Sequence, residues 1–132
     1  MTNQNRIRVL SVDDHALLRE GIASILTMQS DMVLVSQASG GRDAIRQYRE
    51  YRPDVTLMDF RMPDLGGVEA LIAIRAEFPD ARVIMLTTFE GEEEIRRSRE
   101  SGARGYMLKS LPPDEMAQVI RQVHAGETWV LR

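Results

Sequence analysis

Acidic, hydroxyl and basic side chains stand at the ends of short apolar runs in this chain. Five residues follow or close such runs: Asp13, Asp14, Asp59, Thr87 and Lys109. Neighbouring carboxylates repel one another unless a positive group lies between them. If these run ends meet in space, the set predicts a site for a small hard cation with oxygen ligands and several retained waters. Mg²⁺ fits that description before Ca²⁺.

Lys109 is the only lysine in a chain that carries sixteen arginines. A composition this skewed uses arginine wherever a general surface cation suffices. Lysine offers a compact point charge on a flexible stem, whereas arginine offers a rigid planar fork. The position of the one ammonium is either chance or a sign that the site needs a point charge, and the groups that share its end of the sheet decide between the two.

Strand-like and helix-like stretches alternate five times along the chain. The strand-like runs lie at residues 7–12, 32–35, 55–58, 82–87 and 105–109, and the helical stretches at 15–28, 41–51, 68–74, 92–101 and 112–123. Strands without in-out alternation, separated by helices, indicate a parallel sheet covered on both faces. Five such units predict an α/β doubly wound sandwich, in which ligands lie beyond the carboxyl ends of the strands. The five polar residues should therefore share one crevice.

Composition excludes several classes of function. The chain has 132 residues, enough for one domain, and it contains no cysteine, which rules out disulfides and zinc–thiolate sites. A net charge of −3 argues against sequence-independent nucleic-acid binding. No apolar segment is long enough to span a bilayer, and the N-terminus is not signal-like. We expect a cytoplasmic protein without membrane contact.

Each polar residue also has an ordinary structural explanation. Adjacent aspartates at a strand–helix junction often serve as helix N-caps, so Asp14 could cap the first helix. Thr87 alone would be a locally satisfied strand-end hydroxyl, and Tyr106 alone a half-buried strand aromatic. His15 is predicted to start the helix and not to bind the metal, because magnesium prefers oxygen. The first loop is acidic and lacks the glycine pattern of Rossmann and P-loop nucleotide sites.

Together these residues resemble a known family. The matching segments, in order and with the family's spacing, are Val12-Asp13-Asp14-His15, Met58-Asp59-Phe60-Arg61-Met62-Pro63 with Gly67, Leu86-Thr87, and Gly105-Tyr106-Met107-Leu108-Lys109. The chain looks like a response-regulator receiver domain of two-component signalling, over about residues 6 to 126. The Asp-Asp-His triplet and the segment 123–127 are most similar to the NarL/LuxR-type subfamily. The resemblance implies a flavodoxin-like (βα)5 sandwich over residues 1–132, with a five-stranded parallel sheet in the order 2-1-3-4-5.

The resemblance also implies roles around Asp59, which would accept a phosphoryl group as a carboxylate nucleophile. Asp14 and Asp59, with the backbone carbonyl of Arg61, would ligate Mg²⁺ directly, and Asp13 would act largely through water. The metal would neutralise charge on the transferring oxygens.

Two further pairs of roles follow from the same resemblance. Lys109 would pair with one phosphoryl oxygen, and the Thr87 hydroxyl would donate to another. Thr87 would move toward the phosphoryl group on activation while Tyr106 turns inward behind it, as a two-state switch. Arg61 and Phe89 stand where the family tunes phosphoryl lifetime, and Thr88, larger than the residue frequent at its place, would narrow access for attacking water or phosphodonors.

The implied partner is a sensor histidine kinase, with a possible homodimer on phosphorylation. Full-length members of the subfamily usually carry a C-terminal helix-turn-helix domain, so DNA would be contacted only through an output domain absent from this chain. A stand-alone receiver, acting by protein contact or in a phosphorelay, fits as well. An aspartyl-phosphate hydrolase would need an acid where Arg61 stands, so we expect no enzyme beyond self-phosphorylation and slow dephosphorylation. A degenerate receiver is disfavoured because every site residue is present.

The segment at 92–101 is the most unusual predicted helix. Ile95 is its only large apolar anchor, worth about 2–3 kcal/mol. Pairs of Glu92 with Arg96 and of Glu93 with Arg97 would add roughly 0.2–0.5 kcal/mol each. We therefore predict that this helix is the least stable in the domain, which would lower the cost of switching.

Overall fold

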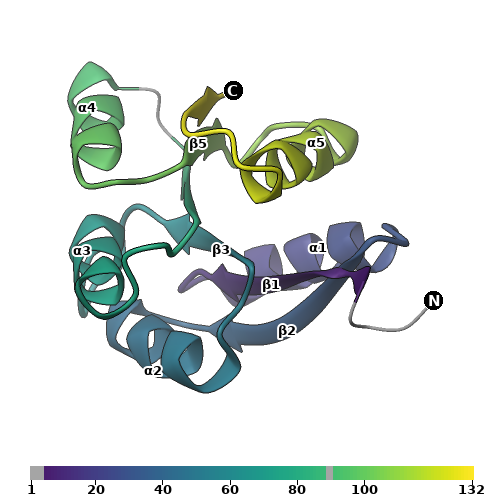
Figure 1. The fold of residues 1–132 in the computed structure, drawn as a ribbon, viewed down its shortest axis with the longest axis horizontal. Coiled ribbons are helices and arrows are strands. Elements are labelled where there is room, and N and C mark those ends of the chain that lie inside the picture. Colours follow the sequence, from purple (N-terminus) through teal and green to yellow (C-terminus); the bar gives the residue numbers. More distant parts are fainter. Residues whose placement is uncertain (1–4, 89–90) are drawn as a thin grey trace.

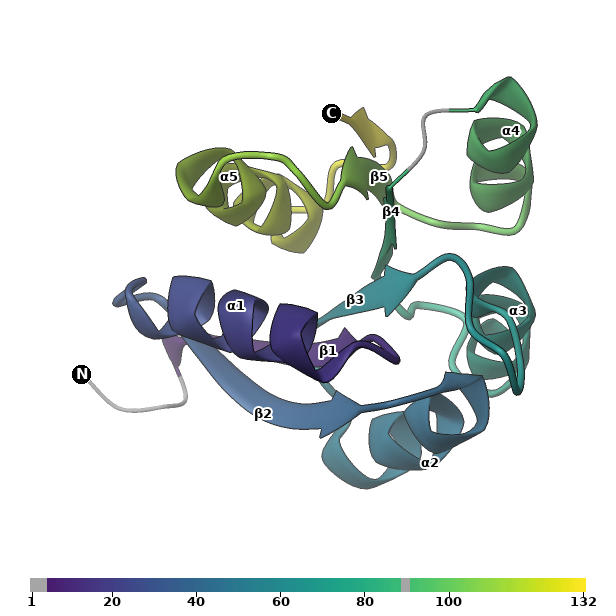
Figure 2. The same ribbon diagram turned by 180° about the vertical axis from the view of Figure 1, so that it is seen from behind.

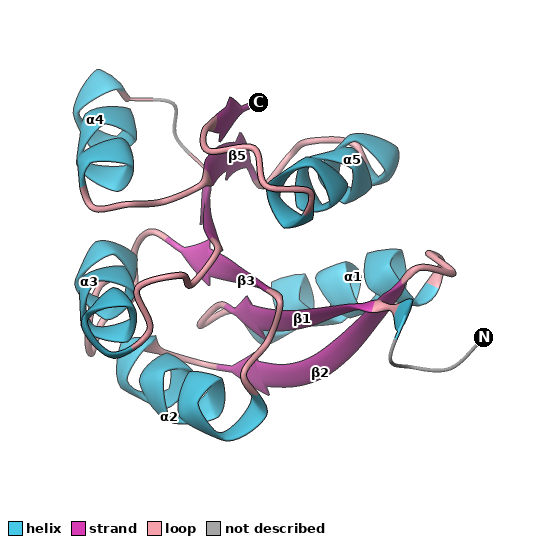
Figure 3. Ribbon diagram, in the orientation of Figure 1, coloured by secondary structure: helices cyan, strands magenta, loops and turns pink. Residues whose placement is uncertain are grey.

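Strands and helices alternate through the computed structural model, which describes residues 5–88 and 91–132 (Figure 1; Figure 3). The strands are β1 (Ile7–Val12), β2 (Met32–Ala38), β3 (Val55–Asp59), β4 (Val83–Thr87), β5 (Gly105–Leu108) and β6 (Val130–Leu131). The helices are α1 (Ala16–Thr27), α2 (Gly41–Tyr51), α3 (Gly67–Glu77), α4 (Glu92–Glu100) and α5 (Pro113–His124). The five predicted strand–helix units are thus confirmed.

The sheet has six strands in the order β2-β1-β3-β4-β5-β6, and every neighbouring pair is parallel. The predicted order 2-1-3-4-5 is confirmed for the first five strands. The prediction of a five-stranded sheet is wrong, because β6 pairs with the outer edge of β5 through Gly105–Val130 and Tyr106–Leu131. A two-residue strand is too short to carry any hydrophobic period, so the sequence pattern gave no sign of it.

Helices cover both faces of the sheet. Helices α1 and α5 lie on one face, and α2, α3 and α4 lie on the other (Figure 1; Figure 2). Alternate residues along each strand therefore enter two separate cores: Val9, Leu57 and Ile84 face α1 and α5, whereas Met58 and Met85 face α2 and α3. Burial on both faces explains the continuous apolar runs of the central strands.

The connections bring the carboxyl ends of β1, β3, β4 and β5 to one edge of the sheet. Strand β1 lies between β2 and β3, so the chain turns in opposite directions from this point, which is where doubly wound sheets bind ligands. Within residues 5–88 and 91–132, no helix combines the length and the apolar character needed to cross a bilayer.

Candidate functional site

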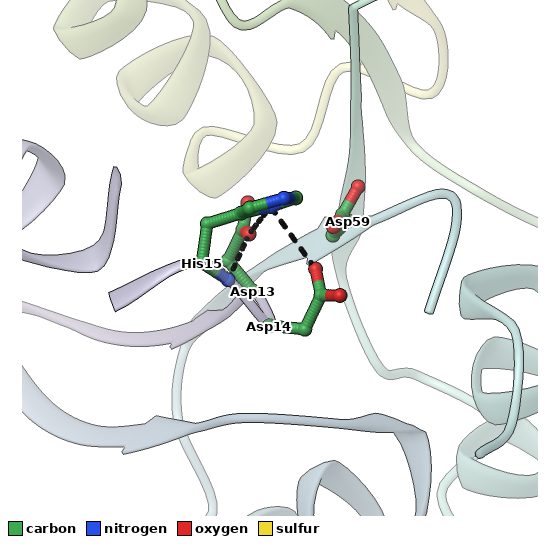
Figure 4. Close-up of side chains that lie close together, drawn as sticks. All are labelled: Asp13, Asp14, His15 and Asp59. Carbon is green, nitrogen blue, oxygen red and sulfur yellow. Dashed lines mark hydrogen bonds and ion pairs between the residues drawn. The ribbon is translucent and has the colours of Figure 1, made fainter. Parts of the chain in front are cut away.

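Three aspartates and a histidine converge where β1 and β3 end. Asp13 directly follows β1, and Asp59 is the last residue of β3, its parallel neighbour. One ligand atom from each of Asp13, Asp14, His15 and Asp59 lies within 4.8 Å of the others (Figure 4). Asp13 and Asp59 are buried, at 0% and 3% exposure, while the Asp14 side chain is 27% exposed. The predicted convergence of the three carboxylates is confirmed.

Lys109 supplies the positive group between the buried carboxylates. It is the first residue after β5, and its Nζ lies 2.8 Å from Asp13 Oδ2 and 3.0 Å from Asp59 Oδ1. Its side chain is only 10% exposed, so the ammonium is largely shielded from water. One point charge that satisfies two separate carboxylates suits lysine better than the fixed fork of arginine.

The two buried carboxyls titrate in opposite directions. Burial raises the pKa of Asp59 to about 6, with a further rise from the charge of Asp13, and the contact with Lys109 only partly offsets this. Burial also opposes ionisation of Asp13, but hydrogen bonds from Lys109 and from the backbone of His15 hold the pKa of Asp13 below its ordinary value. The two carboxylates also hold the pKa of Lys109 above its ordinary value, against the effect of burial. Asp59 is therefore the group that is ionised at an energetic cost.

His15 begins the first helix, as predicted. It is the residue at the N-cap position of α1, so the alternative in which Asp14 caps this helix is not supported. The backbone N–H of His15 donates to Asp13 Oδ1 at 2.9 Å, and the ring Nδ1 lies 3.1 Å from Oδ1 of both Asp13 and Asp14. The contact of the ring with both carboxylates was not foreseen from the sequence, because nothing in a sequence pattern fixes the direction of a side chain.

Thr87 and Tyr106 lie on the neighbouring parallel strands β4 and β5. Thr87 ends β4 and is 3% exposed, one residue beyond the partner of Asp59 in that strand. The backbone N–H of Lys109 donates to the Thr87 carbonyl at 2.8 Å, which ties the two strand ends together. Tyr106 is buried at 1% exposure within β5, and not half-buried as a lone strand aromatic would be. Its carbonyl accepts a hydrogen bond from Arg132, just after β6.

Arg61 directs its side chain away from the carboxylates. Its guanidinium forms an ion pair with Glu94 of α4 at 3.0 Å, and its backbone N–H lies 3.4 Å from Asp59 Oδ1. The role predicted for its carbonyl as a metal ligand stays a prediction. Thr88 is exposed, and Phe89 lies outside the described residues.

The residues present fit a magnesium ion. Three carboxylates supply hard oxygen ligands, and the partial exposure of Asp14 leaves a side open for the waters that Mg²⁺ keeps. A divalent cation would also relieve the repulsion that raises the pKa of Asp59.

The predicted ion pairs within α4 are wrong in their partners. Arg96 pairs with Glu93 and with Glu100, and Arg97 reaches across to Glu69 of α3 at 3.0 Å. Ile95 is only partly buried, and Ser98 is the one buried residue of this helix. The low stability predicted for α4 stays a prediction, but its apolar contact with the domain is as small as expected.

Comparisons with known proteins agree with the geometry. The family model of the response regulator receiver domain matches residues 9–121. The response regulator protein VraR of Staphylococcus epidermidis is 40% identical over 122 residues, which cover 92% of this chain and 58% of that protein. The chain thus spans a little over half the length of this relative.

Two solved structures share the fold closely. A LuxR-family two-component response regulator from Aurantimonas sp. SI85-9A1 has a TM-score of 0.90 at 35% identity, covering 94% of this chain and 89% of that one. The signal receiver domain of the putative response regulator NarL from Mycobacterium tuberculosis has a TM-score of 0.89 at 28% identity, covering 92% and 98%. The chain belongs to the family of response regulator receiver domains, as a LuxR/NarL-type receiver of two-component signalling.

Proposed function

We propose that Asp59 accepts a phosphoryl group from a phosphohistidine of a sensor histidine kinase, with Mg²⁺ as the required ion. A carboxylate oxygen of Asp59 forms the new bond to phosphorus, the bond from phosphorus to the donor imidazole breaks, and the imidazole leaves as the neutral base after taking up a proton. The product is an acyl phosphate on Asp59. The observation that carries the proposal is the position of Asp59, a buried carboxylate that shares the only lysine of the chain with a second buried carboxylate, Asp13.

The chain's own residues prepare this step. Asp13, Asp14, Asp59 and the carbonyl of Arg61 would hold the ion, which supplies charge neutralisation for the transferring oxygens. Lys109 holds Asp59 in place before transfer and follows a phosphoryl oxygen after it. The Thr87 hydroxyl, at the neighbouring strand end, donates to another phosphoryl oxygen.

The conformational output passes through β4, β5 and α4. A phosphoryl group that draws Thr87 and Lys109 toward it makes contacts in only one of two states, and this difference shifts the population. The carbonyl of Thr87 is bonded to Lys109, and Tyr106 lies three residues before Lys109, so a movement at the site reaches β5 directly.

The wider role rests on the relatives. A DNA-binding response regulator of the LuxR family from Staphylococcus aureus has a TM-score of 0.84 at 25% identity. We propose that phosphorylation of this receiver controls a helix-turn-helix output domain, with homodimerisation on phosphorylation, in the cytoplasm. A stand-alone receiver in a phosphorelay is the second candidate.

Intact mass spectrometry tests the phosphoryl transfer. The domain is incubated with Mg²⁺ and acetyl phosphate, in parallel with Asp59→Asn and with a sample in which EDTA replaces Mg²⁺. A single added phosphoryl group on the wild-type chain alone, lost with EDTA, is the expected result. An adduct that survives Asp59→Asn, or no adduct on any sample, contradicts the proposal.

A further inference from the structure

The loop that follows Asp59 rests on the start of α2. The residue before this helix, Gly40, has no side chain with which to cap it. Asp64, from the loop between β3 and α3, takes that place: Oδ1 accepts from the backbone N–H of Gly41 at 3.1 Å and Oδ2 from that of Arg42 at 3.2 Å. Two of the free N–H groups of the first helical turn are thus satisfied by a residue more than twenty positions further along the chain.

Two glycines make this contact sterically possible. A Cβ atom at Gly40 would lie 2.6 Å from Asp64 Oδ1, and one at Gly41 would lie 2.3 Å from the carbonyl oxygen of Leu65. Any larger residue at Gly41 would push the loop backbone away from the helix. The two glycines therefore allow the loop to lie against the start of α2, and Asp64 of the loop supplies the hydrogen-bond acceptor.

The other end of the loop is also held. The N–H of Gly67 donates to the carbonyl of Phe60 at 3.0 Å, and a Cβ atom at Gly67 would lie 2.1 Å from the carbonyl oxygen of Asp59. Arg61 lies between this fixed point and Asp64. Its backbone is thus held on both sides although its own side chain is exposed.

Asp64 is well suited to remain a carboxylate. Its slight burial would raise its pKa, but the backbone N–H groups of Arg42, Leu65 and Gly41 outweigh this and hold the pKa of Asp64 below its ordinary value. Both oxygens can therefore accept hydrogen bonds across the whole neutral range.

We infer that Asp64 is a positioning residue for the metal site: by docking the β3–α3 loop on the N-terminus of α2, it fixes the backbone of Arg61 as a ligand for Mg²⁺. The inference rests on the proposed function, in which that carbonyl binds the ion. If the loop is not docked, Mg²⁺ binding must also order the loop, and the free energy that this costs lowers the observed affinity for the ion. Asp64→Ala should therefore weaken Mg²⁺ binding about fivefold, equivalent to ~1 kcal/mol, the size of a lost helix cap.

The test compares Mg²⁺ affinity with stability in four chains: wild type, Asp64→Ala, Asp64→Asn and Asp43→Ala. Asp43 lies in the same helical turn, but its carboxylate binds Arg46 and Gln47 within α2, so its removal changes the charge without touching the loop. Mg²⁺ is titrated alone by calorimetry or amide chemical shifts, and urea unfolding is measured in EDTA. Asp64→Asn keeps only one of the two oxygen acceptors and turns an NH2 donor toward the helix end, so its Mg²⁺ affinity should lie between those of wild type and Asp64→Ala.

Two results would overturn the inference. In the first, Asp64→Ala unfolds more easily but binds Mg²⁺ as tightly as wild type, which makes Asp64 a helix cap only. In the second, Asp43→Ala binds Mg²⁺ as weakly as Asp64→Ala, which makes charge and not docking the cause. Gly41→Ala displaces the loop while keeping the carboxylate, and should reproduce the loss of affinity. If the wild-type chain takes no phosphoryl group on Asp59, the proposed function fails; if it does and Asp64→Ala binds Mg²⁺ normally, only the role of Asp64 fails.

Discussion

Replacing the phosphoacceptor should make the metal-free domain more stable. Asp59 is buried beside Asp13, and its pKa is raised to about 6, so the folded protein ionises it at a cost. Asp59→Asn keeps the shape of the side chain and removes the charge. Lys109 remains paired with Asp13 at 2.8 Å, so the substitution leaves no unpaired ammonium.

The magnitude follows from the pKa. A rise from 3.8 to about 6 corresponds to about 3 kcal/mol at neutral pH, at 1.36 kcal/mol for each pKa unit. An amide oxygen accepts a weaker hydrogen bond from Lys109 than a carboxylate does, which offsets part of the gain. We expect Asp59→Asn to raise the free energy of unfolding by about 1–3 kcal/mol in EDTA.

The pH dependence has a definite sign. Because the folded pKa of Asp59 lies above the unfolded one, the penalty is absent below about pH 4 and complete above about pH 6. The advantage of Asp59→Asn over wild type should therefore grow across this window. Mg²⁺ at a thousandfold excess over its dissociation constant should reverse the order, because the ion then stabilises the wild-type site by about 4.1 kcal/mol, more than the gain expected for Asp59→Asn.

The difference in free energy of unfolding between wild type and Asp59→Asn is measured by urea unfolding at about pH 4.5 and about pH 7.5, each with EDTA or with Mg²⁺. Asp31→Asn is the matched control, since Arg121 lowers the pKa of Asp31 and removal of that carboxylate should not stabilise the domain. The reasoning is refuted if Asp59→Asn is no more stable than wild type in EDTA at the higher pH. It is refuted equally if the difference does not shrink on acidification.

Three other outcomes are expected. Lys109→Arg should still take up a phosphoryl group, as measured by intact mass, but lose the phosphorylation-dependent change in amide exchange of β5 and α4. The reason is that the planar guanidinium of arginine cannot follow one phosphoryl oxygen as the point charge of lysine does. An exchange response equal to that of wild type would contradict this prediction. Ser98→Ala should raise the free energy of unfolding by about 1 kcal/mol, because among the described residues the buried Ser98 hydroxyl has no hydrogen-bond partner; exposed Ser24→Ala in α1 is the control for helix propensity, and equal gains would show that burial does not matter. Amides of α4 should exchange faster than those of α5, whose apolar face is fully buried; equal protection would contradict the low stability of α4.

Most of the site residues could be predicted from the sequence because they lie at the ends of strands. Apolar runs buried on both faces are easy to recognise, and parallel strands bring their carboxyl ends to one edge, so Asp13, Asp59, Thr87 and Lys109 had to meet. The roles of these residues came from the family resemblance, since position alone does not distinguish a phosphoacceptor from a metal ligand.

Contacts between distant surface residues were not predictable in the same way. Arg97 binds Glu69 of α3 and not its neighbour Glu93, because side-chain direction and the closeness of two helices decide the partner. Strand β2 extends to Ala38, three residues beyond the predicted end, because an edge strand accepts polar residues such as Ser36 and Gln37. The docking of Asp64 on α2 depends on both the loop and the helix being in place, so it cannot be predicted from a local sequence pattern.

The central claim is that Asp59, and not Asp13 or Asp14, forms the acyl phosphate. The most direct measurement is reduction of the phosphorylated domain with borohydride, which converts an aspartyl phosphate to homoserine, followed by peptide mass mapping. Conversion confined to position 59 and dependent on both Mg²⁺ and the phosphodonor is the predicted result. Conversion at position 13 or 14, or none at position 59 in a chain that carries a phosphoryl group, would contradict the account.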